Sequence, residues 1–188
     1  MTEIYVLTKD DKFPTLVQDD SQGQITAETD FALCAASLDM HGKEFGSDYV
    51  PVKLKVADED VRKKGVSDVQ THFMSFLIFS EKALKSLADL LQGAGQTLPV
   101  DSRFPDLRGF HVTRIINDAV DFEHSQYVMY DKGPLIRKLA LHEARIANIP
   151  IFKIHEDPTR IFVSGDFKKR VEQSKLKGFS FLRKIEIT

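Results

Sequence analysis

The sequence predicts a single domain of the mixed α/β (α+β) class, in which helices pack on a mixed β-sheet. Short runs rich in β-branched and aromatic residues recur along the chain, separated by segments of helical or turn character. One arrangement of strand, helix and strand occurs twice. The chain has 188 residues, of which 42% are hydrophobic, and no Gly-, Ser- or Pro-rich linker divides it. This composition suffices for one core.

The N-terminal third predicts two strands joined by polar segments. Residues 3–8 (EIYVLT) are typical of an opening strand. Residues 9–24 hold paired aspartates and Pro14, and we interpret them as a polar connection. Residues 49–56 alternate as in a strand and lead into an acidic cluster at residues 58–60. This part of the chain therefore contributes to the predicted sheet.

A helix is predicted between these two strands, over residues 27–40. Thr29 can cap its first turn, apolar residues follow one face, and Gly42 ends it. Cys34, the single cysteine, lies on this apolar face. A buried, unreactive thiol is therefore expected, and no disulfide can form within the chain.

The repeated arrangement consists of a strand, a serine, a helical segment, a glycine and a second strand. The serine and the glycine lie 13 residues apart in the first copy and 14 in the second. Each serine is placed to cap the helix, and each glycine supplies a left-handed residue that can end it. The pattern predicts a duplicated β-α-β element. The copies are 76–79, Ser80, Gly93 and 98–100, then 161–163, Ser164, Gly178 and 179–182.

The segments around the second copy predict further strands and turns. Residues 109–116 have strand character, and residues 117–125 form a polar turn. Residues 134–146 fit either a strand or a helix begun by Pro134, and both interpretations stay open. Residues 151–163 predict a hairpin with its turn at 156–159.

No spacing typical of a catalytic centre or a cofactor site stands out. Asp118, Asp121 and His124 recur every three residues and could approach one another as a metal site of a hydrolase. The dense spacings of zinc enzymes are missing, and an aspartate that caps a turn explains the same residues. Cys34 lies in no nucleophile motif, and no phosphate-binding glycine loop is present. We therefore expect no catalytic residue, no metal and no cofactor.

Charge is distributed unevenly along the chain. Residues 1–60 hold 13 acidic and 5 basic residues, a net charge of −8, whereas residues 129–188 hold 7 acidic and 13 basic residues, a net charge of +6. The basic run within residues 168–184 could suggest nucleic acid, but its aromatic residues follow the core face of a helix and a strand. The first residues lack the features of a signal peptide or a membrane span, and the expected location is the cytoplasm.

The order and spacing of several motifs resemble the immunity-protein-11 family of bacterial polymorphic toxin systems. The resemblance covers about residues 68–182 and implies one domain, residues 1–188, with a variable part at 1–67 and a family-like core at 68–188. It also implies structural roles for Asp121 and Ser125, since the family has no agreed catalytic residues. The motifs are 78–84 (IFSEKAL), 98–100 (LPV), 116–125 (INDAVDFEHS), 151–154 (IFKI), 161–171 (IFVSGDFKKRV) and 176–181 (LKGFSF).

The resemblance implies a cytoplasmic antidote that binds a cognate toxin and occludes its active site. Many such toxins act on nucleic acids or nucleotides through basic clefts, which an acidic surface can fill. We therefore expect the acidic residues of the N-terminal part to face the toxin. A metal-dependent hydrolase that reverses toxin damage, or an interaction module unrelated to toxins, are the alternatives. The expected contact residues are Asp19, Asp20, Asp58, Glu59 and Asp60.

Overall fold

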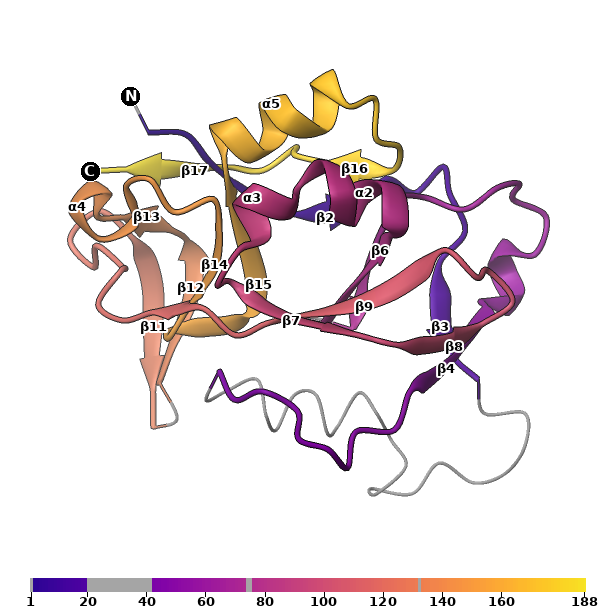
Figure 1. The fold of residues 1–188 in the computed structure, drawn as a ribbon. Helices are drawn as coiled ribbons and strands as arrows, with labels where there is room; N and C mark the ends of the chain where they lie inside the picture. The colour runs from indigo at the N-terminus through magenta and orange to yellow at the C-terminus, as the bar shows by residue number, and fades with distance from the viewer. Residues whose placement is uncertain (1, 20–41, 74–75, 132) are drawn as a thin grey trace.

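The computed structural model describes residues 2–19, 42–73, 76–131 and 133–188. Most of its regular structure is β-strand, with short helices packed on one side (Figure 1). The predicted mixed α/β class is confirmed. The helix predicted over residues 27–40, with Thr29 and Cys34, lies outside the described residues. No helix among the described residues is long and apolar enough to cross a membrane.

The largest sheet has six strands in the order β10-β14-β15-β1-β17-β13. Strand β1 from the N-terminus pairs antiparallel with β15 on one side and with β17 on the other. The predicted opening strand therefore lies inside this sheet, between two C-terminal strands. The strands are β1 (Ile4–Val6), β10 (Ile115–Ile116), β13 (Ala140–Leu141), β14 (Ile151–Ile154), β15 (Asp157–Ser164) and β17 (Lys184–Ile187).

A second, antiparallel sheet has the order β5-β6-β9-β7, and a three-stranded sheet has the order β3-β4-β8. Strand β3 falls in the segment predicted to be a polar connection, so that prediction is wrong for Leu16–Gln18, which pair with β4. The strands are β3 (Leu16–Gln18), β4 (Val52–Val56), β5 (Val69–Phe73), β6 (Phe76–Ser80), β7 (Gly95–Leu98), β8 (Val100–Ser102) and β9 (Leu107–Val112).

Two short pairs complete the β structure. Strand β2 (Thr8–Lys9) pairs with β16 (Phe179–Ser180), which extends the contact between the two termini of the chain. Within the part of the chain that the structure describes, strands β11 (Gln126–Tyr130) and β12 (Gly133–Lys138) pair only with each other, as an antiparallel hairpin. In Figure 1 this hairpin projects from the body of the protein.

The structure contains both copies of the predicted duplicated element, but their second strands differ from the predicted ones. Residues 98–100 run from the end of β7 into β8. Of residues 179–182, only Phe179–Ser180 form a strand, β16, which pairs with β2 and not with the sheet of β15. In the first, β6 is followed by α2 (Glu81–Ser86), α3 (Ala88–Leu91) and β7; in the second, β15 is followed by α5 (Gly165–Gln173), β16 and β17. In both copies the flanking strands are parallel with one antiparallel strand between them, which is β9 in the first and β1 in the second. Each copy is therefore a split β-α-β unit.

The serine caps are confirmed in both copies. The Ser80 hydroxyl oxygen accepts a hydrogen bond from the Ala83 amide at 3.1 Å, and that of Ser164 accepts one from the Phe167 amide at 3.2 Å. The Ser80 hydroxyl also donates to Asp68 at 2.6 Å, and the second Asp68 oxygen accepts the Lys177 amide at 2.6 Å. The cap of the first helix is thus tied to the chain that follows the second.

The glycine stops differ between the copies. Gly93 has φ of +65° and completes a tight turn directly after α3. The second helix ends at Ser174, and the left-handed residue that follows is Lys175, with φ of +50°. Gly178 comes three residues later, where a side chain would collide with Ser67. The prediction that Gly178 ends the helix is therefore wrong; this glycine permits close packing instead.

The two helices lie side by side over one core (Figure 1). Arg170 of α5 donates to the Asp89 carboxylate at 2.6 and 3.0 Å and to the Ser86 carbonyl at 3.1 Å. Beneath them, apolar residues from both copies form one cluster that includes Phe79, Leu87 and Phe167. Packing between the copies therefore joins the two sheets, as expected for a single core.

Strand pairing decides the structure of three further segments. One was left open between strand and helix, one was predicted as a single strand, and one was predicted as a hairpin. Residues 134–146 contain both kinds of structure, with β12 and β13 followed by α4 (Glu143–Ile146). Pro134 lies in a strand and not at a helix start, on an edge where its missing amide hydrogen is tolerated.

Residues 109–116 divide into β9 and β10, which belong to different sheets. In the hairpin at 151–163, Asp157 already pairs with Ile154, so the turn is at 155–156 and not at 156–159.

Substitution of Ser80 by alanine should destabilise the protein by about 1–2 kcal/mol, because it removes the helix cap and one hydrogen bond of Asp68. Urea unfolding followed by circular dichroism measures this change. Ser174→Ala is the control, since its hydroxyl makes no hydrogen bond within the described residues and should change stability by less than about 0.5 kcal/mol. Equal effects of both substitutions would contradict the capping role.

Candidate functional site

The β11–β12 hairpin carries apolar side chains that no other part of the described protein covers. Every residue of β11 is exposed. The exposed fraction is 61% for Met129, 57% for Tyr130 and 54% for Leu135, with smaller values for Tyr127 and Val128. Contiguous exposed apolar residues on a folded protein mark surfaces that contact a partner. We take the hairpin as the candidate site.

Pairing within the hairpin gathers these side chains. Val128 lies opposite Leu135, and Met129 lies opposite Pro134. Near the base, the ring of Tyr127 contacts that of Phe122 edge to face, with 5.0 Å between centroids. Only Ile136 of the hairpin's apolar residues is buried, and it belongs to an apolar cluster that includes Phe152 and Phe162 of the six-stranded sheet. Tyrosine and methionine are enriched where proteins contact one another.

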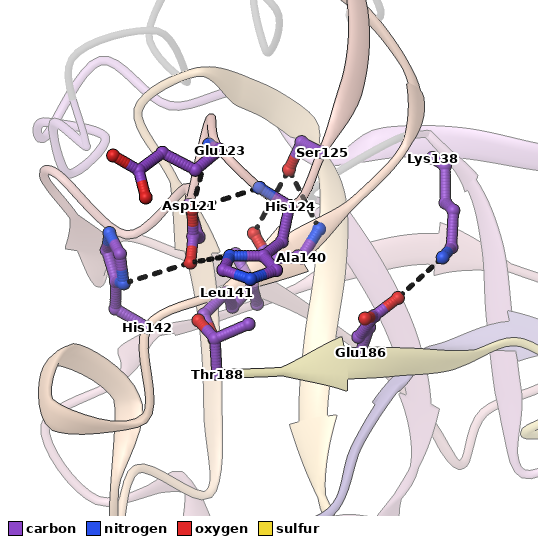
Figure 2. A network of polar contacts seen from close by, with 10 residues as sticks. All are labelled: Asp121, Glu123, His124, Ser125, Lys138, Ala140, Leu141, His142, Glu186 and Thr188. Atoms are coloured by element: carbon purple, nitrogen blue, oxygen red, sulfur yellow. Dashed lines mark hydrogen bonds and ion pairs between the residues drawn. The ribbon is translucent and has the colours of Figure 1, made fainter.

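A turn held by Asp121 fixes the base of the hairpin (Figure 2). One Asp121 carboxylate oxygen accepts the amides of Glu123 and His124, at 2.9 and 3.2 Å. The other lies 2.7 Å from Nδ1 of His124 and 3.7 Å from Nδ1 of His142. The carboxylate is buried and fully engaged. This is the capped turn that the sequence allowed for residues 117–125.

Backbone contacts with Ala140 complete this anchor. The Asp121 amide donates to the Ala140 carbonyl at 3.0 Å, and the Ala140 amide donates to the Ser125 hydroxyl at 3.0 Å. A bulge follows, between Gln126 and Tyr127, where the hairpin begins. Asp121 and Ser125 thus hold the two ends of the hairpin together, which is the structural role implied by the family resemblance.

The Asp121 environment lowers the pKa of its carboxyl group. Burial acts in the opposite direction and raises the pKa, but hydrogen bonds from Thr188, from the His124 ring and from the two backbone amides outweigh it. The pKa falls from 3.8 to about 2. Among the described residues, no group of three or more His, Cys, Asp and Glu side chains is placed to hold a metal ion.

The acidic residues expected to face a partner differ in their exposure. Asp58 and Glu59 are exposed in the short 3-10 helix η1 (Asp58–Asp60). Asp60 is buried; its carboxylate accepts the Thr15 amide at 2.8 Å and pairs with the Lys63 ammonium at 2.7 Å. Asp19 is half-buried at the end of β3. Asp20 lies outside the described residues.

The acidic segment and the hairpin lie at opposite ends of the protein. In Figure 1, β3, β4 and β8 stand at one end and β11 and β12 at the other. Strand β4 leads directly into η1. One rigid surface of a partner therefore cannot be centred on both, and each must be tested separately.

The hairpin was missed by reasoning from the sequence. Its signal was the apolar run Tyr127–Tyr130, followed by Gly133 and a second apolar run. Gly133 has φ of +118°, as a tight reversal of the chain allows. The run could equally have formed a buried strand, and only the tertiary structure shows that it is exposed.

An exposed apolar hairpin on a fixed base is typical of proteins that act by binding another protein. Comparison with protein families identifies the class of binding protein. Residues 18–185 match the Immunity protein family (Imm11), and the chain belongs to this family. Membership implies neutralisation of a cognate toxin, and members are generally non-catalytic inhibitors. The match begins at residue 18, so it includes most of the segment expected to resemble the family only loosely. No curated protein matches the chain.

Replacement of Asp121 by asparagine should change how stability depends on pH. Because the folded pKa is depressed, the stabilisation from the Asp121 charge is complete above its unfolded pKa of 3.8 and is lost as the pH falls toward about 2. The wild type should therefore exceed Asp121→Asn in stability at pH 6, and this difference should shrink between pH 5 and pH 2. Urea unfolding at several pH values measures it; a difference independent of pH would contradict the assignment.

Proposed function

We propose that this protein neutralises its cognate toxin by forming a stable one-to-one complex that occludes the toxin's active site. Family membership supports a toxin as the partner. The observation that carries the binding mode is the exposed hairpin, on which Met129, Tyr130 and Leu135 are each more than half exposed. Burial of such side chains in a partner is a large favourable contribution to binding.

The fixed base of the hairpin supports this mode of binding. Asp121, Ser125 and Ala140 hold the two strands in one position before any partner arrives. A preorganised contact loses less conformational entropy on binding, and the complex is tighter for the same buried area. Protection would then come from affinity alone, in the cytoplasm where the toxin acts.

We also propose that the toxin acts on nucleic acids or nucleotides and that its basic surface contacts acidic side chains of the N-terminal part. The exposure of Asp58 and Glu59 supports this, as does the net charge of −8 over residues 1–60. Asp19 and Asp20 belong to the same proposed surface. Asp60 would act indirectly, because its carboxylate is occupied by Thr15 and Lys63 and holds η1 in place.

The double substitution Met129→Ala and Tyr130→Ala should weaken binding to the product of the neighbouring toxin gene by roughly 30-fold or more, since it removes two exposed apolar contacts. Biolayer interferometry measures the affinity, and growth on co-expression measures protection. Because both side chains are exposed, thermal unfolding should be unchanged.

The matched control removes exposed apolar groups outside both the hairpin and the acidic segment, by Val50→Ala and Leu182→Ala, which are 76% and 96% exposed. These substitutions should leave affinity unchanged. Titration of toxin activity with the wild-type protein should end near one equivalent. Full inhibition at a small fraction of an equivalent would contradict stoichiometric occlusion, and an unchanged affinity of the hairpin variant would remove the hairpin from the interface.

Charge reversal of the acidic segment, by Asp58→Lys and Glu59→Lys, should slow association with the toxin about tenfold at low salt and reduce the salt dependence of the rate. Stopped-flow fluorescence at several ionic strengths measures both quantities. The control is Asp166→Lys with Glu172→Lys, two exposed acids on α5. An equal response to both pairs of substitutions would mean that only net charge matters.

A further inference from the structure

A groove with a volume of about 840 Å³ lies beside the hairpin, between β12 and strands β15 and β17 of the six-stranded sheet. Its walls come from residues 137–139 and 183–187, together with Arg160, Thr2 and Glu143. The hairpin, the last strand of the chain and Thr2, which precedes β1, therefore meet at this groove.

The lining of the groove is basic. Among the described residues, five basic side chains line it and two acidic ones, Glu143 and Glu186. Glu186 pairs with Lys138 at 2.6 Å, as Figure 2 shows. When Glu3 and Asp157, which pair with Lys184 and Arg160, are counted as well, the groove keeps one positive charge in excess. The basic residues are Arg137, Lys138, Arg160, Arg183 and Lys184.

Two of these cations are available for a ligand. Lys138, Arg160 and Lys184 pair with carboxylates of this chain, at distances of 2.5–2.6 Å. Arg137 and Arg183 are exposed and form no ion pair with any residue that the structure describes. Guanidinium groups bind carboxylates through two parallel hydrogen bonds, a geometry that lysine cannot offer.

The groove also has an apolar component and joins the hairpin. Leu139 and Ile185 are buried and Ile187 is half-buried, all in the lining. Arg137 stands two residues from Leu135, one of the most exposed apolar residues of the hairpin. None of the described residues that line the groove is aromatic. Unspecific binding of single-stranded nucleic acid normally uses aromatic stacking, so this lining favours a peptide.

We propose that the groove binds an acidic, extended peptide segment of the partner protein, whose carboxylates pair with Arg137 and Arg183. The identity of that partner as the toxin rests on the proposed function; the chemistry of the groove does not. A partner held by its apolar surface on the hairpin would be oriented by this second contact, because charge pairs at the rim fix the register of an interface.

A fluorescein-labelled octaglutamate peptide tests the groove without the toxin. Fluorescence anisotropy at low ionic strength should show binding to the full-length protein. Arg137→Glu with Arg183→Glu should weaken it by about tenfold or more, since two attractive charges become repulsive. If the charge-reversed protein does not fold, the neutral double variant Arg137→Gln with Arg183→Gln replaces it in the assay. This variant should also weaken octaglutamate binding.

The matched control is Lys85→Glu with Lys169→Glu, which makes the same change in net charge on the exposed faces of α2 and α5. It should leave octaglutamate binding within about twofold. Equal loss in both pairs, no loss in the groove variants, or no binding by the wild type would each overturn the proposal. Tighter binding of an octathymidylate oligonucleotide than of octaglutamate would overturn it as well, in favour of a nucleic-acid ligand. Toxin binding by the hairpin is measured separately and can fail or hold independently.

Discussion

The structure of the candidate site depends on the hydrogen bonds between the turn at residues 121–125 and Ala140. They hold the base of a two-stranded hairpin that has no other described strand beside it. An isolated hairpin of this kind is marginally stable in water. With its base fixed by Asp121 and Ser125, it can present apolar side chains to a partner without a covering layer of its own. The exposed residues and the buried carboxylate are therefore two parts of one arrangement.

The duplicated β-α-β element provides the scaffold, and the candidate site lies outside both copies. Residues 126–138 belong to the segment that connects the first copy to the second. The helices of the two copies pack against each other through one apolar cluster and the Arg170–Asp89 pair. A rigid scaffold with a projecting connection can vary its contact residues without disturbing its core, because few core contacts depend on them.

The features predicted correctly from the sequence are those fixed by neighbouring residues. Ser80 and Ser164 cap helices through amides three residues away, so local spacing was enough. The predictions that failed depend on distant residues. Asp60 was expected on the surface with Asp58 and Glu59, but it meets the Thr15 amide, 45 positions away, and is buried. Strand β3 exists because β4 pairs with it, and the hairpin is a candidate site because no described residue covers it. Neither cause can be read from the local pattern.

Hydrogen–deuterium exchange of the protein with and without the neighbouring toxin tests the central claim most directly. The amides of residues 126–138 lie in a hairpin with two edges open to solvent and should exchange quickly in the protein alone. If the hairpin is the main contact, its exchange should slow strongly in the complex while that of α2 and α5 stays the same. Strong protection elsewhere, with the exchange of residues 126–138 unchanged, would contradict the account.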